Sequence, residues 1–405
     1  MKGERKTAPV IRFKGFSDAW EQRELGEVAT SFEYGLNASS KEYDGENKYI
    51  RITDIDENSH LFNQKNLTSP DFVLINSDNY LLEKGDILFA RTGASVGKSY
   101  CYEERDGRVY YAGFLIRAKI KKKYDAKFIF QNTLTNRYNN FIQITSQRSG
   151  QPGINAQEYA GFDIHTPQLE EQQKIGMFFK QLDDTIALHQ RKLEALKLMK
   201  KGFLQQIFPK KGEKVPRLRF ADFEEEWEQR KLGEIFTERT ERSDKGELIS
   251  VTINSGIVKA SELERKDNSS SNKANYKVVK KGDIAYNSMR MWQGASGCSF
   301  YDGILSPAYT VISPKEDIDP NFMSYMFKKH EMMHIFQRNS QGLTSDTWNL
   351  KFPSLSTIKV KIPPYEEQVR IANLLQNTEN IITFQQNKIS QLQVLKKAHL
   401  QNMFI

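Results

Sequence analysis

The chain contains the same module twice. Residues 12–28 read RFKGFSDAWEQRELGEV and residues 219–235 read RFADFEEEWEQRKLGEI, so that Trp20 falls on Trp227. Four matches of this kind occur in the same order along the two halves, which indicates an internal duplication rather than chance. The three further matches pair LLEKGDILF (81–89) with VVKKGDIAY (278–286), PQLEEQ (167–172) with PPYEEQ (363–368), and KLEALKLMKKGFLQQIF (192–208) with KISQLQVLKKAHLQNMF (388–404).

Each module has the same plan: a short basic leader, a mixed globular region and a long terminal helix. Short runs of β-branched and aromatic residues, such as DILFAR and AYTVIS, are typical of strands. One helix-like segment lies in each module, near 125–144 and near 320–337. We therefore expect an α+β fold. The expected boundaries are 1–167 for the first globular region with its leader, 168–208 for the first helix, 209–218 for a linker, 219–363 for the second globular region and 364–405 for the second helix.

The segments between the matched anchors are not repeated. Residues 29–80 and 236–277 differ in sequence, and the first of them is ten residues longer. The scaffold therefore recurs while the loops do not. This pattern predicts two recognition domains that share an architecture and recognise different things.

The two terminal segments carry the apolar spacing of a coiled coil. From Ile175 onward, apolar residues of the first segment are separated by combinations of three and four positions. Polar residues interrupt this seam at His189 and Lys200, and Gln385 and Lys396 match them in the second segment. We expect the two helices to pair with each other, antiparallel, about a pseudo-twofold axis. A helix docked on its own domain and a homodimer seam are the alternatives.

The charge balance favours a polyanionic partner. Lys plus Arg outnumber Asp plus Glu by 59 to 51, which gives a net charge of +8 and a pI near 9.1. This balance fits nucleic acid, although a mildly basic soluble protein is a common alternative. No stretch approaches the length of a membrane span, the N-terminus lacks the apolar core of a signal peptide, and Cys101 and Cys298 are the two cysteines. We expect a cytoplasmic protein without membrane contact.

Two stretches resemble enzyme motifs. RTGASVGKS at 91–99 resembles a nucleotide-binding P-loop, but the first glycine of a P-loop is required at the position of Thr92, and strand-like residues follow instead of a helix. HEMMH at 330–334 has the spacing of zinc peptidases, but the aligned residues 134–138 (LTNRY) hold no metal ligand. We expect no catalytic residue and no metal. An autonomous nucleotide- or zinc-dependent enzyme built on these stretches is the alternative function.

The duplicated module, the Gly-Asp-Ile strands and the helices that open on Pro-x-x-Glu-Glu-Gln resemble the DNA-specificity subunits of Type I restriction–modification systems. The resemblance covers nearly the whole chain. It implies two target recognition domains, each reading one half of a split, asymmetric site in double-stranded DNA, and paired helices that fix the spacer. A half-active or orphan specificity subunit without a partner is the alternative within the binding class, and a protein-only scaffold that does not bind DNA is a further alternative.

The resemblance also implies that the chain is not itself catalytic. Two methyltransferase subunits, which methylate adenine with S-adenosylmethionine, and ATP-dependent restriction–translocation subunits would bind it. S-adenosylmethionine, ATP and magnesium are then expected on those partner subunits, and no cofactor is expected on this chain.

Polar loops of the globular regions hold the candidate DNA-binding residues. Arginine reads guanine, and asparagine or glutamine reads adenine, through paired hydrogen bonds in the major groove. For any single residue, a solvated loop side chain is the competing interpretation, as it is for the basic run Lys121–Lys123. The candidates are Arg91, Thr92, Ser95, Lys98, Gln147, Arg148, Ser149 and Gln151 in module one, and Asn287, Ser288, Arg290, Gln293, Arg338, Asn339, Ser340 and Gln341 in module two.

Overall fold

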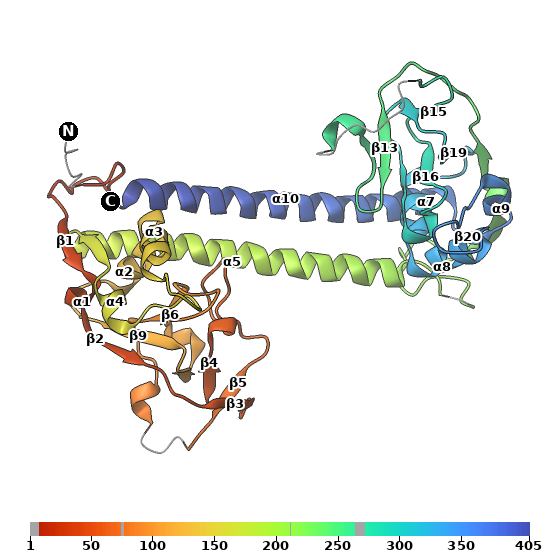
Figure 1. The fold of residues 1–405 in the computed structure, drawn as a ribbon. Helices are drawn as coiled ribbons and strands as arrows, with labels where there is room; N and C mark the ends of the chain where they lie inside the picture. Colours follow the sequence, from red (N-terminus) through yellow and green to blue (C-terminus); the bar gives the residue numbers. More distant parts are fainter. Residues whose placement is uncertain (1–7, 74–76, 211, 264–271) are drawn as a thin grey trace. The chain divides into compact units, whose positions relative to one another are not determined.

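The computed structural model describes residues 8–73, 77–210, 212–263 and 272–405, so the first residues of the N-terminal leader, 1–7, lie outside the described residues. The chain divides into two compact units: Met1–Lys192 with Gln385–Ile405 (unit 1), and Leu193–Phe384 (unit 2). Each unit therefore combines one globular region with a segment from each of the two long helices, α5 (Leu169–Gln206) and α10 (Tyr365–Met403) (Figure 1).

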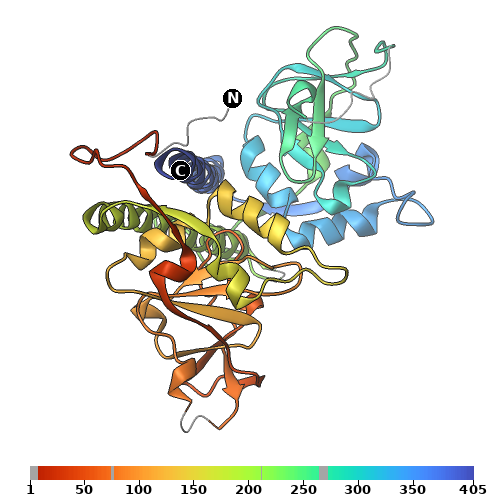
Figure 2. The same cartoon turned by 60° about the vertical axis from the view of Figure 1, so that its left-hand side comes forward.

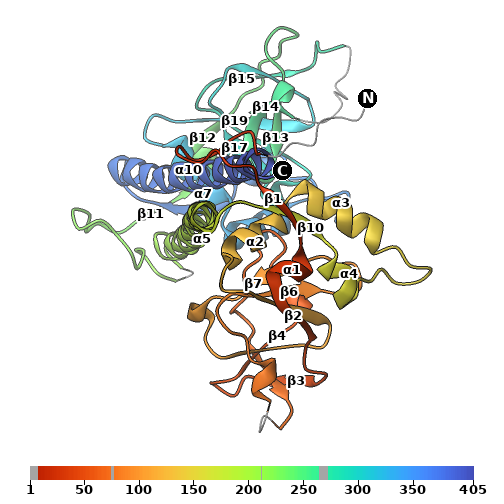
Figure 3. The same cartoon turned by 90° about the vertical axis from the view of Figure 1, so that its left-hand side faces the viewer.

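Unit 1 is built on a four-stranded antiparallel sheet in the order β2-β9-β6-β7. Helix α2 lies between this sheet and α5 (Figure 3). The elements of the globular region are β1 (Glu21–Glu24), α1 (Leu25–Val28), β2 (Ala29–Tyr34), β3 (Ser39–Glu42), β4 (Lys48–Ile50), β5 (Thr68–Asp71), β6 (Asp86–Ala90), β7 (Ser99–Cys101), β8 (Val109–Tyr111), β9 (Leu115–Ile120), α2 (Ala126–Asn132), α3 (Asn136–Thr145), α4 (Ala156–Ala160) and β10 (Asp163–Thr166).

Unit 2 repeats this plan with the sheet order β12-β19-β16-β17. In both units the first strand of the module pairs with the last, β1 with β10 and β11 with β20. The elements are β11 (Glu228–Lys231), α6 (Leu232–Ile235), β12 (Phe236–Glu238), β13 (Ile249–Thr252), β14 (Gly256–Lys259), β15 (Lys277–Val279), β16 (Ile284–Asn287), β17 (Ser296–Cys298), β18 (Gly303–Leu305), β19 (Tyr309–Pro314), α7 (Pro320–Phe327), α8 (His330–Asn339), α9 (Phe352–Ser356) and β20 (Lys359–Ile362).

The α+β fold and the two long helices confirm the prediction from the sequence, with one refinement. Each helix-like segment, near 125–144 and near 320–337, is a pair of helices rather than one. In unit 1 the break follows from local hydrogen bonding: the Thr133 N–H donates to the Phe130 carbonyl and ends α2, and the Thr135 hydroxyl caps the start of α3.

The repeated Glu-Glu-Gln motif fastens each long helix to its module. The second glutamate is fully buried and receives two hydrogen bonds from an arginine of the leader. Arg12 binds Glu171 at 2.7 and 2.8 Å, and Arg219 binds Glu367 at 2.9 and 2.8 Å. A bidentate pair of this kind satisfies both carboxylate oxygens, which a buried glutamate requires.

The glutamine of the motif ties the helix start to the neighbouring short helix. Gln172 accepts the N–H of Asp125, the residue that caps α2, and donates to the Pro167 carbonyl at 2.8 Å. Gln368 makes the same two contacts with Asp319 and Pro363, both at 3.0 Å. The motif therefore recurs because it performs the same structural task in both units.

The C-terminal end of each long helix closes a hydrophobic core with a phenylalanine. In unit 1, Phe404 of the segment after α10 packs on Trp20 and Phe128, with ring centroids 6.3 and 5.3 Å away. In unit 2, Phe208 of the segment after α5 packs on Trp227 and Phe322 at 6.2 and 5.4 Å. The tryptophans are those that the sequence repeat aligns.

The helix segments run antiparallel within each unit, which confirms the expected pairing. In unit 1, Asp183 binds Lys396 at 2.7 Å and His189 contacts Gln385 at 2.7 Å, so numbers rise along α5 as they fall along α10. In unit 2, Lys200 binds Glu379 at 2.5 Å. Each polar residue named in the seam thus has a polar partner, which favours one register over shifted ones.

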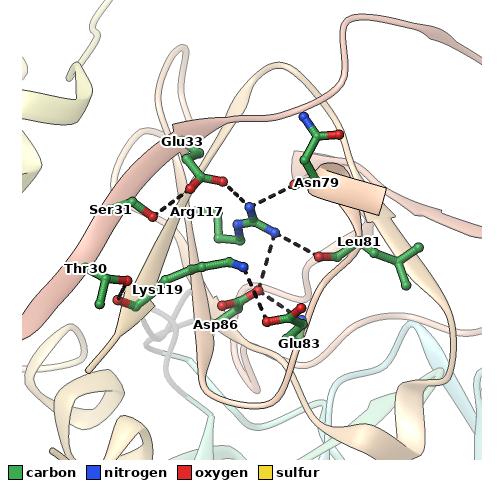
Figure 4. Close-up of polar contacts among 9 residues, drawn as sticks. All are labelled: Thr30, Ser31, Glu33, Asn79, Leu81, Glu83, Asp86, Arg117 and Lys119. Carbon is green, nitrogen blue, oxygen red and sulfur yellow. Dashed lines mark hydrogen bonds and ion pairs between the residues drawn. The ribbon is translucent and has the colours of Figure 1, made fainter. Parts of the chain in front are cut away.

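A buried aspartate stands at the start of the repeated Gly-Asp-Ile strand. In unit 1 it is Asp86, and Arg117 of β9 lies 3.6 Å from its carboxylate (Figure 4). Arg117 also donates to the carbonyls of Asn79 and Leu81, both at 2.8 Å, and forms an ion pair with Glu33. Burial raises the pKa of Asp86 to about 6, in spite of the opposing effects of a backbone hydrogen bond from Glu83 and the Arg117 charge.

Unit 2 keeps the aspartate but takes its arginine from another strand. Asp283 accepts two hydrogen bonds, at 2.6 and 2.9 Å, from Arg239, which follows β12. Arg117 of unit 1 lies on β9, whose counterpart in unit 2 is β19 rather than β12. The buried acid is therefore part of the scaffold, while the arginine that compensates it comes from the adjacent strand β9 in unit 1 and from the residue after β12, the strand beyond β19, in unit 2.

Removal of the aromatic ring that closes unit 1 tests the packing. Phe404→Ala should lower the free energy of unfolding by about 3–5 kcal/mol, because a buried phenylalanine is lost. Urea unfolding followed by tryptophan fluorescence, to which Trp20 contributes from unit 1 and Trp227, Trp292 and Trp348 contribute from unit 2, measures the effect. Phe384→Ala is the matched control: Phe384 belongs to the same helix but is 65% exposed, and its loss should change stability by less than about 0.5 kcal/mol. Equal losses in the two variants would contradict the packing role.

The raised pKa of Asp86 predicts a pH dependence of stability. Its folded-state value of about 6 lies above the ordinary 3.8, so the contribution is fully present below about pH 4 and is lost as the pH rises through about 6. Asp86→Asn cannot ionise. The stability of the wild type relative to this variant should therefore increase, by on the order of 3 kcal/mol, as the pH falls from about 7 to about 4. Chemical denaturation at a series of pH values measures this difference, and a flat difference would disprove it.

Candidate nucleic-acid interface

In unit 1 the fold brings the two predicted loops together. The first loop is the turn between β6 and β7, and the second follows α3, which Figure 2 shows in yellow. The N–H of Gly93 donates to the Pro152 carbonyl at 3.0 Å, and the N–H of Ile154 donates to the Arg91 carbonyl at 2.9 Å. Segments more than fifty residues apart in the sequence therefore form one surface.

Unit 2 builds the corresponding surface from the corresponding segments. The turn between β16 and β17 lies against the segment that follows α8, because the N–H of Leu350 donates to the Ser288 carbonyl at 2.8 Å. Trp292 and Trp348 come from these two segments and meet at 5.2 Å with their rings nearly perpendicular. The pairing of the two loops is thus a property of the module.

The two arginines of the unit 1 surface differ in how many hydrogen bonds they form within the protein. The Arg91 guanidinium lies over the ring of Tyr34, 4.8 Å from its centroid, a contact that does not use its N–H groups as hydrogen-bond donors. Arg148 donates to both carboxylate oxygens of Glu158 at 2.6 Å and to two backbone carbonyls. Arg148 is therefore held within the protein, while Arg91 is the better placed of the two to meet a base edge.

Lys98 points inward rather than to the surface. Its ammonium donates to the Ile55 carbonyl at 3.2 Å and lies 3.5 Å from Glu57, and 11% of its side chain is exposed. The hydroxyl of Thr92 donates weakly to Pro152 at 3.4 Å, and Ser95 is half-buried. The remaining candidates of module one, Gln147, Ser149 and Gln151, are exposed.

The candidates of module two also separate into internal and exposed groups. Ser288 is buried, with its hydroxyl 2.8 Å from that of Thr310, so it faces the core. Asn339 and Ser340 bond back to carbonyls four residues earlier in α8. The other candidates are Asn287, whose amide oxygen accepts the Met289 N–H, the half-buried Gln293, and the exposed Arg290, Arg338 and Gln341.

Aromatic residues at these surfaces were not singled out from the sequence. Tyr34 positions Arg91, and Trp348 lines a hollow of about 440 Å³ with His334, Gln337 and Arg338. The available signal was a tryptophan in an otherwise polar segment, SQGLTSDTWNL, because such segments rarely place a large ring without a partner. The tyrosine carried no comparable signal, since its role depends on a contact between distant strands.

The stretch that resembles a P-loop is a strand connection. Gly97 has a positive φ of 88°, and its N–H lies 3.0 Å from the Ala90 carbonyl and 3.1 Å from the Tyr159 hydroxyl. The chain continues from Lys98 into β7 rather than into a helix. Without a helix N-terminus the backbone amides do not converge on a phosphate as they do in a P-loop.

The His-Glu-x-x-His stretch lies at the start of α8, where His330 and His334 are exposed with ring centroids 4.3 Å apart. Within the part of the chain that the structure describes, no three His, Cys, Asp or Glu side chains are grouped to hold a metal ion. Cys101 and Cys298 are free thiols at the ends of β7 and β17, and burial raises the pKa of each to about 12.

Two of the three lysines in the basic run 121–123 form contacts within the protein. Lys121 donates to the Glu27 carbonyl at 2.6 Å, and Lys123 lies over the ring of Tyr124 at 5.2 Å, while Lys122 is exposed. Among the helices that the structure describes, none combines the length and the apolar character needed to cross a membrane.

Known proteins resemble the chain along most of its length. It is 23% identical over 351 residues to the Type I restriction enzyme MjaVIII specificity subunit of Methanocaldococcus jannaschii, with 80% of each chain covered. Its fold is similar to the crystal structure of a Type-I restriction-modification system S subunit from M. genitalium, at 13% identity and a TM-score of 0.63, covering 98% of this chain and 99% of the other.

The family model that describes the Type I restriction modification DNA specificity domain matches the chain twice, at residues 17–198 and 224–394. These ranges contain both globular regions, both candidate surfaces and most of each long helix. The protein therefore belongs to the family of Type I restriction–modification DNA specificity proteins.

Proposed function

We propose that this chain is the DNA-binding specificity subunit of a Type I restriction–modification complex, in which each globular region reads one half of a bipartite, asymmetric site in double-stranded DNA. The observation that carries the proposal is the pair of equivalent surfaces, each made from a strand turn and the loop after a helix. The two surfaces are built from equivalent backbone segments, but the side chains on those segments differ. Two different half-sites are the targets that such a pair fits.

The available side chains favour direct reading of base edges. Arg91 in unit 1 and Arg290 in unit 2 belong to equivalent turns but occupy different positions within them. Arginine binds two acceptors of guanine in the major groove, and each such bidentate pair contributes about 1–3 kcal/mol of discrimination. A shift of the arginine by two positions would move the base that is read. The chain's net charge of +8 supplies the attraction to phosphate that positions such contacts.

The long helices fit the role of a spacer. The 38 residues of α5 span about 57 Å at 1.5 Å per residue. Continuous helices are stiff, and the polar pairs in their seam oppose a change of register. In this proposal the helix pair sets the number of unspecified base pairs between the two half-sites.

Catalysis in this proposal is assigned to partner subunits. Methyltransferase subunits would bring S-adenosylmethionine for adenine methylation, and restriction–translocation subunits would use ATP and magnesium. The chain's relatives are named as specificity subunits, and its two resemblances to enzyme motifs occur in a strand connection and on an exposed helix turn. No cofactor is assigned to this chain.

Apolar side chains on the helices support the binding of two equivalent partners. Leu188 and Phe384 are exposed and stand 196 residues apart, which is the offset of the repeat. Unit 1 combines Leu188 with exposed Val394 and Leu395 of α10, and unit 2 combines Phe384 with the equivalent residues Leu198 and Met199 of α5. Exposed apolar side chains that recur at matching positions of the two copies are the ones that we assign to protein contacts. We assign one methyltransferase subunit to each.

Each recognition surface can be tested by one substitution. Arg91→Ala should weaken binding to the complete site by about tenfold to a hundredfold and relax the sequence preference of one half-site only, because one bidentate contact is lost. Arg290→Ala should relax the other half-site. Sequencing of the adenines methylated by the reconstituted complex on a random DNA library measures both preferences. Arg217→Ala, in an exposed arginine bound to Glu213, is the control, and loss of both half-sites in a single variant would contradict independent reading.

The two partner interfaces can be tested separately. Leu188→Glu should remove one methyltransferase subunit, Phe384→Glu the other, and the double variant both, because a charge in an apolar contact leaves a buried ion without a partner. Native mass spectrometry of the mixed subunits reports the stoichiometry. Gln386→Glu introduces the same charge at another exposed position of α10 and should leave it unchanged. Two bound subunits in the double variant would refute this assignment.

A further inference from the structure

Unit 2 contains a hollow of about 810 Å³ between its helix segments and the junction of α7 and α8. Its wall is strongly basic, because six lysines line it against two glutamates. The charged residues of the wall are Lys197, Lys200, Lys201, Lys210, Lys328, Lys329, Glu331 and Glu379.

Both glutamates are already engaged by lysines. Glu379 binds Lys200 at 2.5 Å and also accepts the hydroxyl of Tyr325 at 2.7 Å. Glu331 binds Lys329 at 3.2 Å. Within the described part of the chain, the other four lysines of the wall form no ion pair with a carboxylate.

Lys328 stands out among these residues. It is half-buried between α7 and α8, and among the described residues no hydrogen bond or ion pair reaches its ammonium group. Burial lowers its pKa, Glu379 opposes this effect and Lys200 adds to it. A partly desolvated cation without a partner is costly, and an anion in the hollow would offset that cost.

Unit 1 provides an internal comparison, because it has a hollow of about 560 Å³ at the equivalent place. There the ion pair of Lys396 with Asp183 corresponds to that of Lys200 with Glu379. Gln131, the counterpart of Tyr325, lies 3.5 Å from the aspartate. The ion pair across the helices therefore belongs to the scaffold of both units.

Three of the lysines that line the hollow of unit 2 have uncharged counterparts in unit 1. When the capping residues Asp125 and Asp319 are aligned, Lys328 falls on Leu134 and Lys329 on Thr135. On the long helices, Lys197 falls on Gln393. The hollow of unit 1 is lined by three lysines and two acids, so the excess of positive charge is a feature that one copy of the module has and the other lacks.

We propose that the hollow of unit 2 binds a phosphate group, with Lys328 as its central ligand and Lys197 and Lys201 at its rim. Lysine ammonium groups bind phosphate as point charges that need no planar geometry. Two sources share this chemistry: a phosphodiester of the bound DNA, which rests on the proposed function, and a free phosphorylated compound, which does not.

The first arm of the test measures free phosphate chemistry. The full chain is titrated with sodium pyrophosphate by isothermal calorimetry in a chloride buffer. Lys328→Gln and Lys201→Gln should each weaken binding by about tenfold, since each removes a charged contact. Lys397→Gln, the counterpart of Lys201 in unit 1, should leave it unchanged. Thermal unfolding of each variant verifies that it is folded.

The second arm measures the salt dependence of DNA binding. Binding of a random-sequence duplex is recorded against salt concentration, because each lost phosphate contact reduces the slope of log K against log salt by about 0.9. A reduced slope in Lys328→Gln, together with lost pyrophosphate binding, assigns the hollow to the DNA backbone. Lost pyrophosphate binding with an unchanged slope assigns it to a free phosphorylated compound.

A transfer experiment completes the test. Leu134→Lys combined with Gln393→Lys introduces the lysines of unit 2 into unit 1 and should raise the pyrophosphate stoichiometry from one to two. Unchanged pyrophosphate affinity and an unchanged salt slope in both Lys328→Gln and Lys201→Gln would overturn the proposal. A wild-type chain that binds pyrophosphate but no DNA would instead refute the proposed function and leave the phosphate site standing.

Discussion

The closure of each hydrophobic core by the end of a long helix is the constraint on which the rest of the structure depends. Phe404 packs on Trp20 in unit 1, and Phe208 packs on Trp227 in unit 2. The residues that complete unit 1 are thus the last in the chain, far from the globular region that they serve. Neither unit is complete until both long helices are formed. In each unit, the helix end that closes the core belongs to the helix that runs antiparallel to the module's own long helix.

Much of this architecture was predictable because its signals are local or periodic. The repeat, the spacing of apolar residues and the polar slots at His189 and Gln385 indicated two helices that pair in one register, and these two side chains meet. The Gly-Asp-Ile strands were equally clear. What the pattern did not predict was the partner of the buried aspartate. Arg117 and Arg239 come from different strands, and a contact between strands distant in sequence leaves no periodic signal.

The recognition surfaces were predictable as loops but not as individual side chains. Both pairs of loops lie together, as a shared module requires. Within them, Lys98 bonds to a carbonyl of the neighbouring loop, Ser288 faces the core and Arg148 is held by Glu158. Each of these residues is of a type that can form hydrogen bonds with base edges. A polar residue in a loop satisfies its hydrogen bonds either within the protein or outside it, and that choice depends on neighbours that only the tertiary structure supplies.

The two copies of the module show where such a protein can diverge. Pairs that are buried and satisfied on both sides, such as Arg12 with Glu171 and Arg219 with Glu367, recur, because removal of one partner leaves an uncompensated charge that costs about 3–5 kcal/mol. Positions that face solvent or a hollow carry no such cost. The recognition turns and the wall around Lys328 are positions of that kind. A new half-site preference and a phosphate contact can therefore arise in one copy while the core, the helix pairing and the other copy stay intact.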